Sequence, residues 1–112
     1  MLEWLAGLDV RDGDPVAARD LPAAVTAGAL RYADGSRQSF HASGLTTYIE
    51  GAHPTKGQWS VDDDGRFISF WPPSYRATYE VTWLVTDGRV TGLRFVDLRT
   101  GDHFDGHFRD HG

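Results

Sequence analysis

Residues 75–98 read YRATYEVTWLVTDGRVTGLRFVDL and carry the clearest structural signal in the chain. In the first half, apolar and aromatic residues alternate with polar ones, the period of a β-strand with one buried face. Asp87-Gly88 follows, a dipeptide that favours a two-residue hairpin turn. The second half is again rich in β-branched and aromatic residues. The stretch therefore predicts two antiparallel strands, at 75–86 and 89–98, joined by a tight turn.

Alternation also predicts which residues of these two strands face the interior. The buried face of the first strand is expected to hold Ala77, Tyr79, Val81, Trp83 and Val85. In the second strand, one face holds Val90, Gly92, Arg94, Val96 and Leu98. We expect that face to be internal, with Arg94 in the cavity. Leu93 and Phe95 then lie outside, covered by the N-terminal segment or by a partner subunit.

The same turn chemistry recurs along the rest of the chain. Asp34-Gly35 and Asp64-Gly65 are further hairpin signals, and other corners are expected at 43–44, 54–57, 72–74 and 100–101. These turns separate eight predicted strands at about 29–33, 36–42, 45–51, 57–62, 65–71, 75–86, 89–98 and 102–110. Eight sequential strands joined by short turns predict a mainly β fold, an eight-stranded antiparallel meander barrel.

Residues 1–28 differ in composition, being rich in Ala, Leu, Asp and Pro. One face of a short helix is predicted from Leu2, Trp4, Leu5 and Leu8. A second helical turn is predicted at 21–25, with Pro22 near its first position. We expect this segment to be a helical cap, either over one barrel end or along the barrel side, within one domain spanning 1–112.

Length, charge and cysteine content limit the function classes. The chain has 112 residues, no Cys and a formal net charge of -5. The absence of Cys favours a reducing compartment, and we expect a cytoplasmic protein. An acidic chain without a basic stripe is not expected to bind nucleic acid, and no stretch is long and apolar enough to cross a membrane. No phosphate-binding glycine loop occurs, and we expect no cofactor.

Aromatic residues dominate the candidate interior. If the buried faces are assigned correctly, they supply a set of candidate ligand-binding residues: Trp59, Phe67, Trp71, Tyr75, Tyr79 and Trp83. Apolar walls with a few polar groups are typical of small-molecule pockets. The alternative is that these rings simply fill the barrel as core. Tyr75 and Trp71 flank the 72–74 corner, where they form either a gate at the barrel mouth or a packed corner.

Four polar residues are candidates for acid–base chemistry: His41, Tyr48, Glu50 and Arg94. An imidazole or carboxylate enclosed by apolar walls shifts toward its neutral form, and so toward a useful acid or base. Arg94 would then stabilise developing negative charge. The alternative is that His41 and Glu50 point outward as ordinary surface residues, because the strand register is not fixed by the sequence.

Two charged runs resemble metal sites, and neither is expected to be one. Residues 103, 105, 107, 109 and 111 share a face of the last strand and include three His. Same-face neighbours on a strand lie about 6–7 Å apart, which does not suit one tetrahedral ion. We expect Phe104 and Phe108 to point inward and the polar set to be solvated. Residues 62–64 are all Asp, and we interpret them as a hairpin tip because the spaced ligands of a calcium loop are missing.

Residues 57–71, GQWSVDDDGRFISFW, resemble a motif of small bacterial calycin-like (lipocalin-like) barrel proteins. In those proteins a Gly-x-Trp strand runs into an Asp-Gly hairpin and then an aromatic strand. The resemblance covers about 29–110 in topology and Gly57 to Trp83 in motif. It implies a barrel that commonly binds small hydrophobic molecules and sometimes acts as a cofactor-free cyclase or isomerase.

Three functions are therefore expected in decreasing order. The first is non-enzymatic binding of a small hydrophobic or aromatic molecule. The second is a cofactor-free barrel enzyme, such as a cyclase, isomerase, dehydratase or decarboxylase. The third is a structural or dimerising module, in which Leu93 and Phe95 meet a second subunit.

Overall fold

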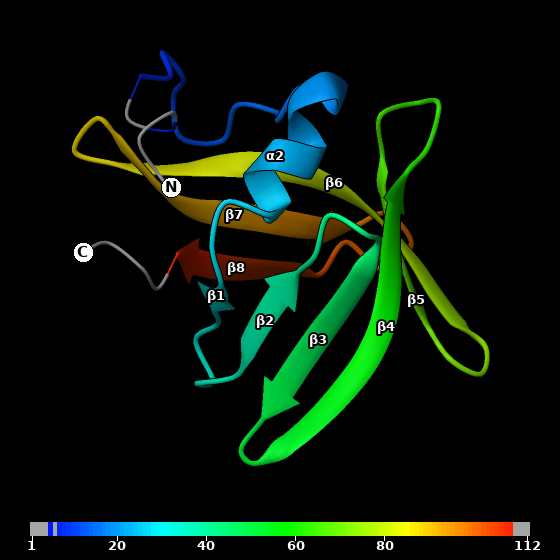
Figure 1. Cartoon of the computed structure of the whole chain (residues 1–112). Helices are drawn as coiled ribbons and strands as arrows, with labels where there is room; N and C mark the ends of the chain where they lie inside the picture. Colours follow the sequence, from blue (N-terminus) through cyan, green and yellow to red (C-terminus); the bar gives the residue numbers. More distant parts are fainter. Residues whose placement is uncertain (1–4, 6, 109–112) are drawn as a thin grey trace.

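A computed structural model describes Leu5 and residues 7–108 of the chain (Figure 1). Its eight strands are β1 (Leu30–Arg31), β2 (Arg37–Phe40), β3 (Leu45–Glu50), β4 (His53–Val61), β5 (Phe67–Trp71), β6 (Tyr75–Thr86), β7 (Arg89–Asp97) and β8 (His103–Phe108). Each strand pairs antiparallel with the next, and β1 pairs with β8. The predicted eight-stranded antiparallel meander barrel is confirmed.

The three predicted Asp-Gly turns are present, but only Asp87-Gly88 is the predicted two-residue turn. The loops at Asp34-Gly35 and Asp64-Gly65 each hold three residues between the hydrogen-bonded pairs Tyr32–Ser36 and Asp62–Arg66. Asp87 and Gly88 both have positive φ, 54° and 76°, as a two-residue type I′ turn requires. The corner predicted at 54–57 is wrong, because these residues lie inside β4 and the chain turns at Gly51 and Ala52 instead. The Pro and Gly of this segment are therefore strand residues. Pro54 pairs with Ile49 near the start of β4, and Gly57 leaves room for the Trp71 ring.

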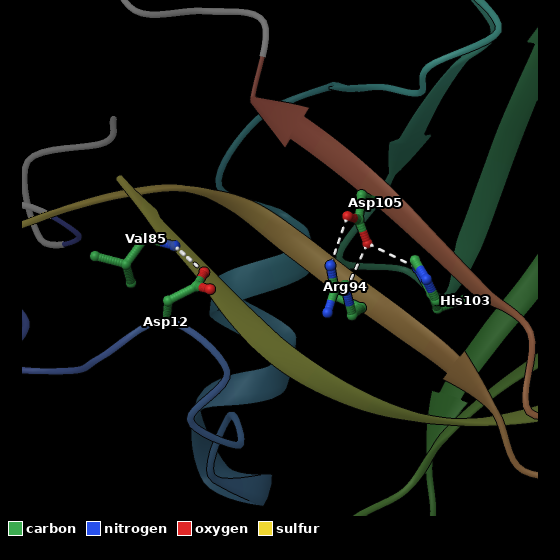
Figure 2. A network of polar contacts seen from close by, with 5 residues as sticks. All are labelled: Asp12, Val85, Arg94, His103 and Asp105. Atoms are coloured by element: carbon green, nitrogen blue, oxygen red, sulfur yellow. Dashed lines mark hydrogen bonds and ion pairs between the residues drawn. The ribbon is translucent and has the colours of Figure 1, made fainter. Parts of the chain in front are cut away.

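Residues 13–16 run along β6 and complete its hydrogen bonding. β5 pairs with β6 only as far as Tyr79. Beyond it, the Gly13 amide donates to the Trp83 carbonyl (2.9 Å) and the Val16 amide donates to the Val81 carbonyl (2.9 Å). The Asp12 carboxylate accepts from the Val85 amide at 2.9 Å (Figure 2). The N-terminal segment therefore satisfies backbone groups that the short β5 leaves open.

A short helix closes one end of the barrel. A single 3-10 turn, η1 (Ala18–Asp20), leads into α2 (Leu21–Val25), where a helical turn was predicted. Leu21, Ala24 and Val25 of α2 are buried against barrel residues that include Trp83 and Leu93. In Figure 1, α2 lies beside β6 and β7, and the β3–β4 hairpin reaches to the other end of the barrel. The predicted helical turn at 21–25 is confirmed. Leu2 and Trp4 lie outside the described residues, whereas Leu5 is buried.

The faces of β7 are the reverse of those predicted. Leu93 and Phe95 are 0% and 4% exposed and point inward, whereas Arg94 lies on the outer face. The pairing of β6 with β7 shifts register between Leu84 and Val85, so that Val85 pairs with Val90 and Leu84 with Gly92. Strict alternation fails across this irregularity, and Val90 packs against the core although Arg94 does not. Counting in steps of two from Val90 therefore assigned Arg94 to the wrong side.

Close approach of β7 and β8 depends on glycine at position 92. A Cβ atom built on Gly92 would collide with the Gly106 carbonyl oxygen and lie 2.9 Å from the Cα atom of His107. Both contacts are with backbone, which cannot yield as a flexible side chain would. The β7–β8 pairing is therefore incompatible with a larger residue here.

We expect Gly92→Ala to lower the free energy of unfolding by about 1–3 kcal/mol, the usual cost of overpacking. Urea titration followed by Trp fluorescence measures the change. Val96→Ile is the matched control, because it adds a methyl group at a half-buried position on the same strand. Equal stability of Gly92→Ala and wild type would contradict the close approach.

Candidate ligand-binding cavity

The barrel end opposite α2 holds a cavity of about 350 Å³. Eight of its thirteen lining residues are aromatic. The lining consists of Tyr32, Asp34, Ser36, Gln38, Phe40, Tyr48, Thr55, Phe67, Ser69, Trp71, Tyr79, Phe95 and Phe104. The barrel is thus filled on the α2 side and hollow on the other. The volume lies near the lower end of the range for small-molecule sites.

Three phenylalanines form the floor of the cavity. The ring centroid of Phe67 lies 5.6 Å from that of Phe40 and 5.5 Å from that of Phe95. Phe40 and Phe95 are 6.1 Å apart and nearly stacked. All three are at most 7% exposed and belong to the core that α2 covers. The floor therefore separates the hollow half of the barrel from the filled half.

The walls are made by three tyrosines, Trp71 and Phe104. Tyr48 lies between Tyr32 and Trp71, with centroid distances of 6.4 and 6.3 Å. On the far side, the rings of Tyr79 and Phe104 meet edge to face at 6.4 Å. These rings belong to separate strands or to the β1–β2 connection, and barrel closure brings them together.

Trp71 keeps its place in the wall because position 57 is glycine. Gly57 is buried within β4, and a Cβ atom there would lie 2.7 Å from Cζ3 of Trp71 and 2.8 Å from the Phe70 carbonyl oxygen. Real Cβ atoms do not approach so closely. The glycine of the Gly57-Gln58-Trp59 motif therefore makes room for the ring of Trp71 and not for that of Trp59.

A partly buried chain of hydrogen bonds holds one wall in place. The Tyr32 hydroxyl donates to Gln38 Oε1 (2.7 Å), and Gln38 Nε2 donates to Thr46 Oγ1 (2.9 Å). The Thr46 hydroxyl in turn donates to the Ser39 carbonyl oxygen (2.8 Å). Burial raises the pKa of Tyr32, with further contributions from the nearby Tyr79, Tyr48 and Asp34. Its phenol is therefore neutral at ordinary pH, and its oxygen retains lone pairs for a ligand.

Ser69 brings a poorly satisfied polar group to the cavity lining. The residue is 3% exposed, and its Oγ makes no hydrogen bond of normal geometry with another described residue. Burial raises the pKa of the neighbouring Tyr79, and the nearby Ser69 hydroxyl offsets part of that rise. A buried hydroxyl without a good partner costs about 1–3 kcal/mol, which a ligand group could recover.

The charge at the cavity is negative. Asp34 is the single charged residue among the described residues of the lining. Its Oδ1 accepts hydrogen bonds from the hydroxyl and amide of Ser36 at 2.6 and 2.9 Å. These hydrogen bonds lower the pKa of Asp34, so the carboxylate is ionised at neutral pH. Within the described part of the chain, no Lys, Arg or His contributes to the lining.

The six predicted ligand-binding aromatics divide into two groups. Phe67, Trp71 and Tyr79 line the cavity. Trp83 lies in the filled half at 2% exposure, and Trp59 stacks on Phe67 while its indole donates to the His41 carbonyl (2.9 Å). Tyr75 pairs with Trp71 across the 72–74 corner but is 48% exposed, and it is not among the residues that line the cavity.

The four candidate acid–base residues are not brought together. Tyr48 lines the cavity, but His41 is an exposed residue of the β2–β3 turn. Glu50 shares the inward face of β3 with Tyr48, yet lies past the cavity at the exposed strand end. Arg94 is on the outer wall in a bidentate pair with Asp105. The expectation that His41, Glu50 and Arg94 surround one interior site is wrong.

Several lining residues escaped the sequence reasoning. Phe95 and Phe104 are cross-strand partners on β7 and β8 and line the same wall of the cavity. Phe95 was missed because the faces of β7 were predicted in reverse, whereas Phe104 was expected to point inward but was not named as a ligand-binding residue. Tyr32, Gln38 and Phe40 alternate in the β1–β2 region, so period-two counting carried a usable signal there. Ser69 was visible as the small residue between Phe67 and Trp71 on one face of β5.

The two charged runs adopt ordinary roles. The Asp62 carboxylate accepts from the amides of Asp64 and Arg66, as expected of a hairpin tip. In β8, Phe108 is buried and Phe104 reaches the cavity, while His103 and His107 are exposed on the outer face. Arg109 and His111 lie outside the described residues. Searching the described residues finds no group of three or more His, Cys, Asp or Glu arranged to hold a metal ion.

No helix among residues 5 and 7–108 is long and apolar enough to span a bilayer. Comparisons of the chain with family models, with curated proteins and with solved structures found no match. Functional inference therefore rests on the cavity itself.

Replacing Gly57 with Ala is expected to displace the Trp71 ring while leaving the backbone conformation allowed, because Gly57 does not have positive φ. The fluorescence maximum of the protein should shift, and it should not shift in a Trp71→Phe background, which lacks the displaced ring. The same shift in both backgrounds would show that Gly57 acts elsewhere.

The Arg94–Asp105 pair should give a pH-dependent contribution to stability (Figure 2). The Arg94 guanidinium lowers the pKa of Asp105, with a smaller contribution from His103. Stability from a lowered carboxyl pKa is present above the unfolded value of about 3.9 and is lost as pH falls through the folded value.

Asp105→Asn should therefore reduce the free energy of unfolding at pH 7 by up to about 1 kcal/mol, since both side chains are partly exposed. Urea titrations between pH 7 and pH 2 should show the difference from wild type shrinking in acid. A difference independent of pH would mean that the ion pair is not its source.

Proposed function

We propose that this protein binds a small, flat, at least partly aromatic molecule in the open half of its barrel. The observation that carries the proposal is the shape of the interior: a cavity of about 350 Å³ whose lining is mostly aromatic. Aromatic walls provide large apolar area and prefer defined ring geometries, which suits a planar ligand.

The distribution of side chains supports binding over a barrel that is filled as core. Trp83, Leu93 and Phe108 fill the α2 side of the barrel. The core on that side is complete with them and the Phe40–Phe67–Phe95 floor, and the remaining aromatic rings are not required to fill it. Above that floor, rings stand around a space instead of meeting across it. The buried Ser69 hydroxyl adds a polar group that a ligand could satisfy.

The topology is also that of calycin-like barrels, eight antiparallel strands in simple sequence around a cavity open at one end. We therefore extend the proposal to a calycin-like binding protein. The lack of Cys fits a reducing, cytoplasmic setting.

Binding is better supported than catalysis. The titratable groups in the lining are three phenols, Tyr32, Tyr48 and Tyr79, and the Asp34 carboxylate. Burial raises the pKa of Tyr32 and Tyr79, so neither is a base at neutral pH. Leu93 and Phe95 do not support the predicted dimerising role, because both are buried inside the barrel.

A cavity-filling variant tests the proposal. Thr55 is exposed, pairs with Tyr48 across β3 and β4, and lines the cavity. Thr55→Phe should place a ring in the mouth and weaken binding of neutral aromatic compounds such as indole and 2-naphthol by at least about tenfold. Isothermal titration calorimetry measures the affinity.

Lys56→Phe is the matched control, because Lys56 is the exposed neighbour on the opposite face of β4. It should bind like wild type. Failure of wild type to bind any compound of a panel of one-ring and two-ring aromatics would overturn the proposal, as would equal binding by the two variants.

A further inference from the structure

The described residues that line the cavity carry negative charge and no cationic side chain. Among the described residues, Asp34 is the single charged member of the lining, and the remaining polar side-chain groups are hydroxyls, one amide and the Trp71 indole. Aromatic faces add a negative electrostatic potential of their own, which attracts cations. If the cavity is a binding site as proposed above, its electrostatics constrain the charge of the ligand.

Half of the Asp34 carboxylate is available to a ligand. Oδ1 accepts both hydrogen bonds from Ser36, which fix the side chain in the β1–β2 connection. Oδ2 has no partner within residues 5 and 7–108. The side chain is therefore held in place with one free anionic oxygen.

Aromatic rings stand next to this carboxylate. Asp34 is close enough to Tyr32 to raise the pKa of its phenol. Tyr32 contacts Tyr48, and Tyr48 contacts Trp71, so three rings follow one another along this wall. The Tyr32 hydroxyl donates its hydrogen bond to Gln38, so it can only accept a hydrogen bond from a ligand. Carboxylate, ring faces and hydroxyl oxygen all favour a positively charged donor.

We propose that the ligand joins a flat ring system to a positively charged nitrogen. The ring lies in the depth of the cavity against Phe40, Phe67 and Phe95. The nitrogen lies at the mouth, near Asp34 and the faces of Tyr32 and Tyr48. An anionic ligand of the same shape would meet the Asp34 carboxylate and the ring faces, and no Lys, Arg or His of residues 7–108 lines the cavity to stabilise it.

Three indoles of similar size but different charge test this selectivity. Tryptamine is cationic at pH 7, tryptophol is neutral and indole-3-acetate is anionic. Calorimetry on the full chain should show tryptamine binding at least about tenfold tighter than indole-3-acetate, with tryptophol between them. Asp34→Asn keeps an acceptor oxygen for Ser36 and removes the charge, and it should reduce the preference for tryptamine severalfold.

Asp64→Asn is the charge-matched control. It removes one negative charge from the β4–β5 hairpin at the α2 end of the barrel, and it should leave the preference unchanged. Equal affinities for the three indoles, tighter binding of indole-3-acetate, or equal effects of the two Asn variants would overturn the charge assignment alone. Failure of all three indoles and of indole itself to bind would instead contradict the proposed function.

Discussion

Contact among Phe40, Phe67 and Phe95 is the constraint on which the interior depends. Their rings come from β2, β5 and β7, so they meet only when the sheet curls far enough to close. Once in contact, they block the barrel across its width. Below them α2 and Trp83 complete a packed core, and above them the aromatic walls are left unfilled. Folding and the proposed binding therefore use opposite faces of the same three rings.

Small residues decide how closely the strands approach around this floor. Gly92 allows β7 and β8 to meet, and Gly57 lets the Trp71 ring lie over β4. The polar residues follow a similar division of roles. The Tyr32–Gln38–Thr46 chain is internally satisfied and holds the wall, whereas Ser69 and the outer oxygen of Asp34 retain hydrogen-bonding capacity. The cavity thus combines a rigid frame with a few free polar groups.

Much of the fold could be predicted from the sequence because Asp-Gly turns and period-two alternation report local backbone geometry. The β6 faces were predicted correctly, and the cap at α2 followed from Pro22 and the change in composition. The β7 faces were predicted incorrectly, because the register shift at Leu84 and Val85 depends on the pairing of β6 with β7. The prediction that His41, Glu50 and Arg94 face the cavity is wrong for a related reason. Whether a polar residue reaches the cavity depends on the strand register and on its depth along the barrel, and residue type does not encode either.

Intermolecular nuclear Overhauser effects between a bound aromatic compound and isotope-labelled protein test the central claim most directly. With the compound near saturation, we predict cross-peaks from its ring protons to the side chains of Tyr48, Trp71 and Phe95, which line the cavity. Cross-peaks confined to exposed residues of the outer wall, such as Tyr75 and Leu98, would contradict a binding site inside the barrel.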